Sequence, residues 1–443
     1  MTAPLPDVEV PAAPLWTLPD DARVALVSPY GGGNLGDAAI LESAIYGIRR
    51  RLPRAEIFGL TLNPAATTDR HGIPAYPCTG VRLRYYRATN AVRRRDDGAA
   101  PSDSEEKADA SPIAALKRAA RAVPGLQQLR TFGQSVAGDL RHRRSAARWL
   151  AGCRLILVAG GGQVDDYWGG AFGHPYVLWE LSSLARRLVA RALAAADYVS
   201  FRDQGSMSRS AFAGAAGRVV PDLAYGLPWR KIVDANSPPA SRARPPASAR
   251  PPRVALSPMS YCAPDLWPEV HPDKYERHVG TVVELGARML EAGWEVVLVH
   301  SDSNDRVPVS DVAKRLGARV GPEQRARVET RATDRLPELL DALAGVDLMI
   351  AARLHGVILA HVVGRPVLAL SYERKVATVM REMDHMEHCL ELETMDPAQA
   401  FGKVEAMLEK RAVLEADVQA KASARRAAVE AQWDRLFTRE ART

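Results

Sequence analysis

Short apolar runs alternate along this chain with glycine-rich or charged turns and longer amphipathic stretches, and this alternation limits the fold most strongly. Residues 24–28 (VALVS) are the first such run, a turn at 29–36 follows, and residues 37–51 have helical periodicity. The apolar positions of that helix share one face: Ile40, Leu41, Ile45 and Ile48. Residues 56–61 form the next apolar run. The order strand, helix, strand predicts a parallel sheet with a right-handed crossover.

The same alternation recurs further along the chain. In the first half, the expected strands are 154–159, 197–203 and 219–223, with a helix from about residue 176 leading into the second. In the second half, the expected strands are 253–257, 294–300, 347–351 and 366–370. The expected helices there are 275–292, 311–316, 336–344 and 357–363. The pattern predicts an α/β protein with two Rossmann-like lobes that face a cleft.

A chain of 443 residues is too long to fold around a single hydrophobic core, so two domains with additional terminal segments are expected. Residues 235–252 (ANSPPASRARPPASARPP) lack apolar periodicity and form the clearest linker. It separates an N-terminal lobe at 21–234 from a C-terminal lobe at 253–396. Residues 1–20 are an extension, and the Ala/Glu/Lys/Arg-rich residues 397–443 are predicted to be helical.

The net charge of +7 has one source. Residues 82–148 contain 15 Lys and Arg against 7 Asp and Glu, a net charge of +8. No recognisable nucleic-acid-binding module accompanies them, so nucleic acid is not expected as a partner. A basic surface facing an anionic membrane or substrate is one interpretation, and a solvated, partly disordered insertion is the other.

The compartment is predicted from what the sequence lacks. Cys78, Cys153, Cys262 and Cys389 form no CxxC pair, which argues against a disulfide framework or a zinc site. We find no apolar stretch of spanning length and no secretory signal near the start. A cytoplasmic protein is expected, with peripheral contact to the inner membrane face through residues 82–148.

The first glycine-rich turn, Gly31–Asp37, follows the first strand, at the edge where α/β sheets bind ligands. It satisfies GxGxxG, a weak signal, but the Gly-Lys-Ser/Thr of a P-loop is absent. Backbone N–H groups here and the following helix suit an anion. Substrate contact is predicted for Gly32, Gly33, Asn34 and Asp37, and a tight turn without a ligand is the alternative.

A second glycine-rich turn at 160–166 follows another apolar run. Gly161, Gly162 and Asp166 are its candidate substrate-binding residues, because a carboxylate there accepts hydrogen bonds from sugar hydroxyls or acts as a base. A sharp turn with solvated acids is the alternative. Arg202 closes the next strand and suits a carboxylate or phosphate, unless it serves an internal pair with Asp203 or Asp222.

The most specific run is Arg353-Leu-His-Gly356, which lies between an apolar strand and a helix. A cation and a titratable group at a helix N-terminus suit a phosphorylated substrate, and His355 transfers a proton near neutral pH. A core histidine bonded to backbone is the alternative. Tyr372 and Lys375 follow the next strand and are expected to line the same cleft. No metal site is expected; the run Asp384–His388 is interpreted as a solvated helix face.

Taken together, these motifs resemble the polysaccharide pyruvyl transferase family. The pieces that carry the resemblance are GGGNLGDAAILES, LILVAGGGQVDD, YVSFRDQGS, VVPDLAYGLP and VDLMIAARLHGVILAHVVGRPVLALSY, in the family's order over about residues 24–395. The resemblance implies a GT-B-like fold and transfer of a pyruvyl group from phosphoenolpyruvate to a sugar of a polysaccharide or lipid-linked glycan, with no further cofactor. It implies catalytic roles for His355, Arg353 and Arg202, with the glycine turns and Asp37 contacting donor or acceptor.

One departure from the family pattern lies between the second glycine turn and Arg202. Family members have a further buried strand there, whereas residues 176–193 run as unbroken helical pattern. The N-terminal lobe is therefore expected to be one strand short, with either a longer helix or a poorly folded, inactive lobe as the result. Two alternative functions stay open: a glycosyltransferase of the same fold using a nucleotide sugar, and an inactive scaffold at the membrane face.

Overall fold

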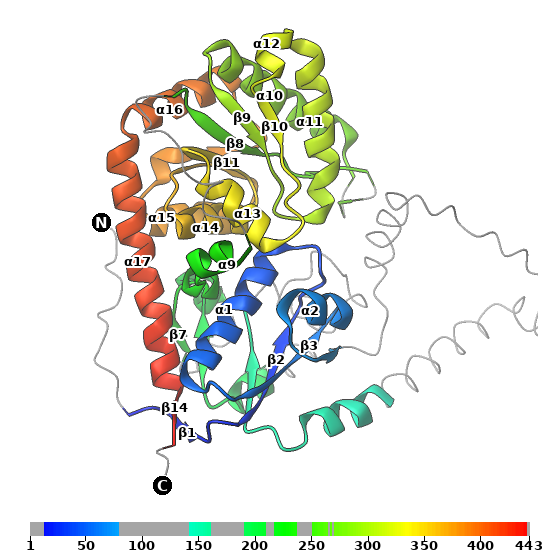
Figure 1. Ribbon diagram of the computed structural model, residues 1–443, viewed down its shortest axis with the longest axis vertical. Coiled ribbons are helices and arrows are strands. Elements are labelled where there is room, and N and C mark those ends of the chain that lie inside the picture. The colour runs from blue at the N-terminus through cyan, green and yellow to red at the C-terminus, as the bar shows by residue number, and fades with distance from the viewer. Residues whose placement is uncertain are drawn as a thin grey trace, which may run out of the picture.

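The computed structural model describes residues 13–78, 141–160, 190–209, 217–236, 250–264, 266–267 and 270–440. Figure 1 shows two lobes, the N-terminal one below and the C-terminal one above, with one long helix running beside both. Each lobe is built on parallel β-strands. The α/β, two-lobed fold class predicted from the sequence is confirmed.

The lower lobe is built on a parallel sheet with the order β4-β3-β2-β5. Its strands are β2 (Arg23–Ser28), β3 (Glu56–Thr61), β4 (Ala75–Pro77) and β5 (Leu155–Val158). Val24 pairs with Ile57 on one side and with Leu155 on the other. The predicted runs 24–28, 56–61 and 154–159 are thus neighbouring strands, whereas the short edge strand β4 was not predicted.

Helix α1 (Leu35–Arg51) connects β2 to β3, and the four predicted apolar positions are each at most 2% exposed. A second helix, α2 (Pro64–His71), begins after Asn63, whose side chain accepts a hydrogen bond from the N–H of Ala66, with Pro64 in the first turn. The apolar face of α1 packs on one side of the sheet with Val24, Leu26 and Ile57. Because α1 follows the end of β2, it begins at the end of the sheet that faces the upper lobe and runs back along the sheet to the start of β3.

In the described part of the lower lobe, the strands form two separate sheets. Strands β6 (Val199–Phe201) and β7 (Gly217–Val219) form a separate two-stranded parallel sheet. On β5, Ile156 and Val158 are 52% and 63% exposed. No described strand pairs with the outer edge of β5. The predicted shortage of one strand concerns a segment that lies largely outside the described residues and stays a prediction.

The predicted strand at 219–223 is wrong in its position. β7 ends at Val219, and residues Leu223–Gly226 form the 3₁₀ helix η1. Pro221 has no N–H to donate to a sheet. The side chain of Asp222 then accepts a hydrogen bond from the N–H of Ala224, which starts η1. Helix α9 (Trp229–Asn236) follows and ends where the predicted linker begins; residues 237–249 lie outside the described residues.

The upper lobe contains a six-stranded parallel sheet with the order β10-β9-β8-β11-β12-β13. Its strands are β8 (Arg253–Ser257), β9 (Glu295–Leu298), β10 (Val328–Thr330), β11 (Leu348–Ala351), β12 (Val367–Ser371) and β13 (Cys389–Glu391). The four predicted strands of this lobe are confirmed. The two edge strands, β10 and β13, were not predicted because three residues carry too little periodicity.

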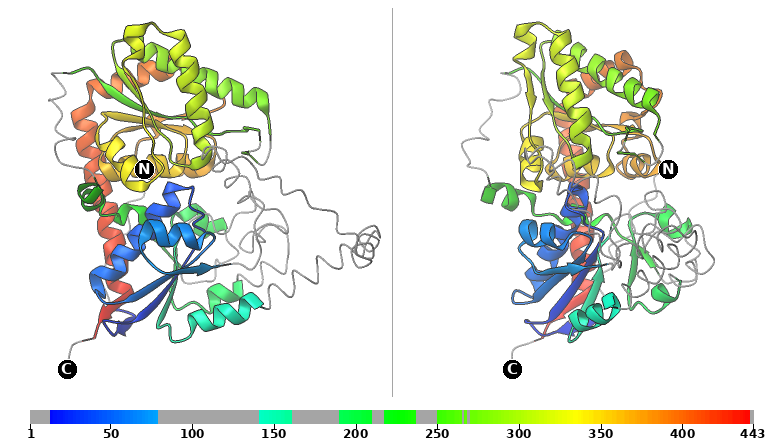
Figure 2. Two further views of the ribbon diagram at one scale, coloured as in Figure 1. Left: turned by 45° about the vertical axis from the view of Figure 1, so that its right-hand side comes forward. Right: turned by 90° about the vertical axis from the view of Figure 1, so that its right-hand side faces the viewer.

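Helices cover both faces of the upper sheet (Figure 2). They are α10 (Pro272–Glu291), η4 (Ser303–Asp305), α11 (Arg306–Arg319), α12 (Pro322–Arg325), α13 (Leu336–Ala344), α14 (Leu354–Val363), α15 (Arg374–Glu382) and η5 (Met386–His388). Because α14 begins at Leu354, three residues before its predicted start, His355 lies in its first turn and Arg353 immediately precedes it.

The C-terminal segment returns to the lower lobe (Figure 1). After α16 (Pro397–Glu409), helix α17 (Arg411–Leu436) runs alongside both lobes, and β14 (Phe437–Arg439) pairs in parallel with β1 (Trp16–Leu18). One apolar cluster contains Leu41 of α1, Leu343 of α13, Val357 of α14 and Trp433 of α17. The two lobes therefore share a core rather than meeting at a wet surface. None of the described helices combines the length and hydropathy of a membrane span.

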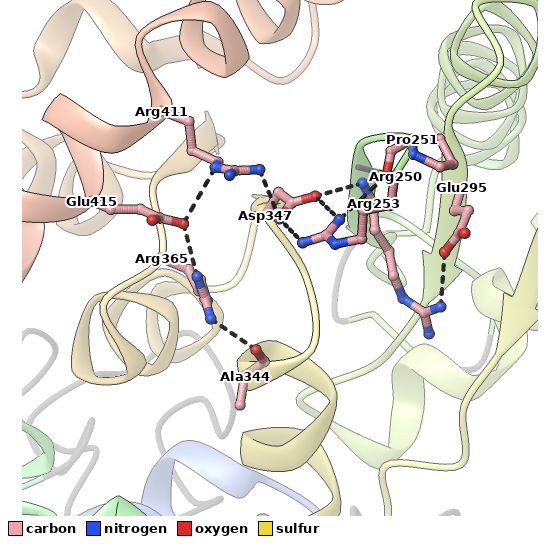
Figure 3. A network of polar contacts seen from close by, with 9 residues as sticks. All are labelled: Arg250, Pro251, Arg253, Glu295, Ala344, Asp347, Arg365, Arg411 and Glu415. Carbon is pink, nitrogen blue, oxygen red and sulfur yellow. Dashed lines mark hydrogen bonds and ion pairs between the residues drawn. The ribbon is translucent and has the colours of Figure 1, made fainter. Parts of the chain in front are cut away.

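A buried carboxylate ties α17 to the upper sheet (Figure 3). Asp347, which is 2% exposed, accepts hydrogen bonds from the guanidinium of Arg250 at 2.5 and 2.6 Å and from the N–H of Arg253 at 2.8 Å. The Arg411 guanidinium at the start of α17 lies 3.0 Å away. Burial alone raises the pKa of Asp347, but these partners outweigh it and lower the pKa.

Candidate functional site

The loops after β2 and β9 meet where the carboxyl ends of the two sheets face each other. The N–H of Leu35 donates to the carbonyl of Ser301 at 2.9 Å, and the N–H of Ser303 donates to the carbonyl of Gly33 at 2.9 Å. Asn34 Nδ2 donates to Asp302 Oδ2 at 3.2 Å. The predicted substrate turn Gly31–Asp37 is thus bonded to the other lobe.

Two glycines of this turn permit that close approach. Gly32 has φ of +95°, a left-handed conformation that favours glycine. A Cβ atom on Gly33 would lie 2.3 Å from Ser303 Oγ. Asn34 Oδ1 accepts from the N–H groups of Gly36 and Asp37 at 2.8 and 3.1 Å. The first-turn amides expected to hold an anion are therefore already bonded within the protein, and substrate contact by Gly32, Gly33 and Asn34 stays a prediction.

His355 reaches from the upper lobe to a carboxylate of the lower lobe. Its Nε2 lies 3.5 Å from Asp222 Oδ2, and the Arg202 guanidinium lies 3.5 Å from the same oxygen. Asp222 follows β7 and Arg202 follows β6, so neighbouring strand ends bring them together. Burial alone raises the pKa of Asp222, but His355, Arg202 and the N–H of Ala224 outweigh it and hold the pKa well below its usual range.

The imidazole of His355 also packs against the start of α1. A Cβ atom on Gly36 would lie 2.0 Å from the ring, so only glycine leaves room for it. Asp37 is the next residue. Burial raises the pKa of Asp37 to about 6; His355 opposes this shift, and the carboxylates of Asp302 and Asp222 add to it. The site thus contains two carboxyl groups, Asp37 and Asp222, with opposite pKa shifts, and His355 lowers the pKa of both.

Arg353 was predicted to have a catalytic role, but its donors bind the protein. Nε and Nη2 donate to the two oxygens of Asp305 at 2.9 and 2.7 Å, and Nη2 also donates to Ser260 Oγ at 3.1 Å. Its side chain is 11% exposed and that of Asp305 is fully buried. This geometry is the bidentate fork of a structural ion pair. A direct catalytic role for Arg353 stays a prediction.

Tyr372 and Lys375 both follow β12. Tyr372 packs in an aromatic cluster with Tyr261 and Trp267, with ring centroids 5.9 and 5.8 Å away. Lys375 Nζ lies 2.7 Å from Glu373 Oε2 and keeps 32% of its side chain exposed. Its positive charge opposes the rise in the pKa of Asp37 that burial causes. The other predicted substrate-binding residues, Gly161, Gly162 and Asp166, lie outside the described residues.

Four polar residues at strand ends were not singled out from the sequence. Asp302, Asp305 and His300 follow β9, and Ser260 follows β8. Asp305 Oδ1 accepts from both the N–H and the hydroxyl of Ser260 at 2.9 and 3.0 Å. His300 Nε2 lies 3.2 Å from Asp334 Oδ1. The run SDSND immediately after an apolar strand was the available signal, because ligands and their supports gather at that edge of an α/β sheet.

The interpretation of Asp384–His388 as a solvated helix face is wrong for His385. His385 is 5% exposed, and its Nε2 lies 2.7 Å from Asp417 Oδ2 of α17. The segment forms a turn and η5 instead of a long helix. Long-range packing of α17 over this segment buries the ring, which local periodicity does not predict. The four cysteines all lie among the described residues, and none forms a disulfide bond with another.

One of the comparisons with known proteins shows the family of this chain. A family model described as polysaccharide pyruvyl transferase matches residues 34–374. Comparison with curated protein sequences finds no significant match. Among solved structures, the N-terminal domain of Candida albicans trehalose-6-phosphate phosphatase is similar at 13% identity and a TM-score of 0.48, over 95% of this chain and 97% of that one. The spinosyn rhamnosyltransferase SpnG is similar at 16% identity and a TM-score of 0.44, over 94% and 97%. Similarities this low carry no information on substrate.

Proposed function

The chain belongs to the polysaccharide pyruvyl transferase family, and we propose that it transfers a pyruvyl group from phosphoenolpyruvate to a sugar of a polysaccharide or glycan precursor. The product is a pyruvate ketal on two hydroxyl groups. The observation that supports this chemistry in the structure is the group formed by His355, Asp222, Arg202 and Asp37 between the carboxyl ends of the two sheets.

The proposed reaction needs proton transfer in both directions. Carbon 3 of phosphoenolpyruvate gains a proton, and the cation that develops at carbon 2 is attacked by a sugar hydroxyl, which loses its proton. A second hydroxyl then attacks carbon 2 and loses its proton, the bond from carbon 2 to the phosphate oxygen breaks, and hydrogen phosphate leaves with that proton, so the ketal carbon holds two sugar oxygens. A site for this reaction requires an acid, a base and cations for the carboxylate and the phosphate.

We assign the acid and base roles to groups with suitable surroundings. Asp37, with a pKa of about 6, retains a proton at slightly acidic pH and loses it readily, which suits delivery to carbon 3. His355 accepts the proton of the attacking hydroxyl. Asp222 stays ionised, orients the ring and stabilises the charge that the ring gains.

The cations of the site differ in their availability. Arg202 and Lys375 keep 29% and 32% of their side chains exposed, whereas Arg353 is bound to Asp305 and Ser260. In the proposal, Arg202 and Lys375 therefore bind the carboxylate and phosphate of phosphoenolpyruvate. Arg353, which immediately precedes α14, supports the first helical turn that carries His355, and Tyr372 packs in the neighbouring aromatic cluster.

Phosphate release from phosphoenolpyruvate, measured across a panel of free and lipid-linked glycans, tests this function. His355→Ala is expected to lower the rate by about 10²- to 10⁴-fold, the usual contribution of a proton-transfer group. His271→Ala is the matched control, because His271 is exposed at the start of α10 and its side chain makes no capping hydrogen bond there. Ketal formation that is unaffected by His355→Ala would remove the histidine from the mechanism. Stabilisation by a nucleoside diphosphate, with no response to phosphoenolpyruvate, would favour a glycosyltransferase.

A further inference from the structure

A basic hollow lies on the outside of the lower lobe, between helices α1, α9 and α17. Its volume is about 560 Å³, and its lining residues are Tyr46, Arg49, Arg50, Lys231 and Arg426. Figures 1 and 2 show the three helices beside one another on this side of the molecule. A helix rises about 1.5 Å per residue, so Arg49 lies about 18 Å along α1 from Asp37. The hollow is therefore separate from the site that contains His355.

Few carboxylates of the protein neutralise the positive charges of this hollow. Arg49 and Arg426 are exposed, and neither pairs with a carboxylate of the described residues. Lys231 Nζ lies 5.4 Å from the ring centroid of Tyr46. Arg50 lies 2.9 Å from Glu430 but keeps 55% of its side chain exposed. Four positive charges therefore line the hollow, with Glu430 as the carboxylate bonded to one of them.

Helix stabilisation explains only part of this arrangement. Basic residues in the last turn of α1 interact favourably with its dipole. Arg51 fulfils that role: it donates to the carbonyl of Gly47 at 3.2 Å and pairs with Glu430 and Asp434. Lys231 and Arg426, however, come from other helices, far away in the sequence. Bringing like charges together costs free energy unless a counter-ion is present.

We propose that this hollow binds a phosphate-bearing anion. Arginine side chains match phosphate oxygens in a bidentate fork, a lysine adds a mobile point charge, and the hydroxyl of Tyr46 adds a donor. Four cations around one hollow suit a diphosphate or a lipid head group better than a singly charged ion. Such a phosphate group belongs either to a free, soluble phosphate or to a lipid at the surface of an anionic membrane. The proposal involves none of the residues assigned to pyruvyl transfer.

Two binding measurements on the full chain test this proposal. Pyrophosphate is titrated calorimetrically, and sedimentation is measured with vesicles of equal parts phosphatidylglycerol and phosphatidylcholine, against vesicles of phosphatidylcholine alone. Each basic side chain near an anionic surface contributes about 1 kcal/mol, so the double variant Arg49→Ala/Arg426→Ala is expected to bind about 30-fold more weakly. The matched control is Arg277→Ala/Lys314→Ala, which removes two exposed cations from the upper lobe and is expected to bind within about twofold of wild type.

The results distinguish lipid head groups from free phosphates as the ligand. Weakening confined to the anionic vesicles identifies lipid head groups, and weakening with pyrophosphate identifies free phosphates. The proposal is overturned by three results: binding to neither probe, binding unchanged by the double variant, or equal weakening in the control. Turnover of phosphoenolpyruvate with a soluble acceptor is expected to be unchanged in the double variant, so this test is independent of the proposed function.

Discussion

Two arginines that follow strand ends in opposite lobes have very different surroundings. Arg353, after β11, binds both oxygens of Asp305 at 2.9 and 2.7 Å and is 11% exposed. Arg202, after β6, lies 3.5 and 3.7 Å from Asp222 and Asp203 and is 29% exposed. The first pair has the geometry of a structural support. The second is loose and open enough to exchange its partner for a ligand, so a strand-end arginine is assigned a role by its partners.

The largest expected effect is on the buried ion pair of Arg353 and Asp305. Asp305→Ala leaves Arg353 buried without its partner, and the N–H and hydroxyl of Ser260 also lose their acceptor. Removing one member of a buried ion pair costs about 3–5 kcal/mol. We expect the free energy of unfolding, measured by urea denaturation, to fall by that amount.

A double variant serves as the control for this prediction. Arg353→Met is measured alone and together with Asp305→Ala. In the double variant both charges of the pair are absent, so part of the lost stability is expected to return. If the double variant is as unstable as the sum of the two single variants, the pair is not the support that its geometry indicates.

For the partly exposed pair of Arg202 and Asp222, we expect a small loss of stability and a large loss of turnover. Arg202→Gln removes a partly exposed cation with long contacts, so the stability loss is expected to stay below about 1 kcal/mol. Turnover of phosphoenolpyruvate is expected to fall about 10- to 100-fold, because a charged contact to the substrate is lost. Arg218→Gln, an exposed arginine in the same small sheet, is the matched control. A large stability loss with unchanged turnover would reverse the assignment of the two arginines.

The smallest expected effect is on the pH dependence of stability. Burial raises the pKa of Asp37 from 3.8 to about 6, so the folded chain binds more protons than the unfolded chain between these values. Stability is therefore expected to decrease as pH rises from about 4 to about 6 and to stay lower above that range. Asp37→Asn should remove this decrease and stabilise the protein at pH 8 by about 1 kcal/mol.

Thermal or urea denaturation across this pH range measures the effect. Asp21→Asn, an exposed change in the same lobe, is expected to keep the wild-type profile. A variant at Asp37 with the wild-type pH profile would mean that the carboxyl group is not buried against His355 and Asp302.

The fold was predictable from the sequence because its strands are apolar runs that end in sharp turns. Residues 56–61 and 253–257 match β3 and β8. Local pattern failed where a strand is short, as at β10 and β13, and where distant packing decides burial, as for His385 beneath α17. These features depend on neighbours that are far away in the sequence.

The candidate site was only half predictable. His355, Arg353 and Arg202 were identified because polar residues after apolar strands gather at one edge of a sheet. What each side chain does depends on partners from other elements. Asp305, 48 residues before Arg353, neutralises that arginine. Asp222, from the other lobe, lies against His355. These pairs cannot be predicted from the spacing of residues in a single sequence.

The central claim is that Asp222 and His355 act as one unit across the two lobes. A double-mutant cycle of Asp222→Asn and His355→Ala, measured as phosphate release from phosphoenolpyruvate, tests it most directly. If Asp222 acts through the histidine, the double variant is expected to be no slower than His355→Ala alone. Independent effects that multiply, with a double variant slower by the product of the two single losses, would contradict the account.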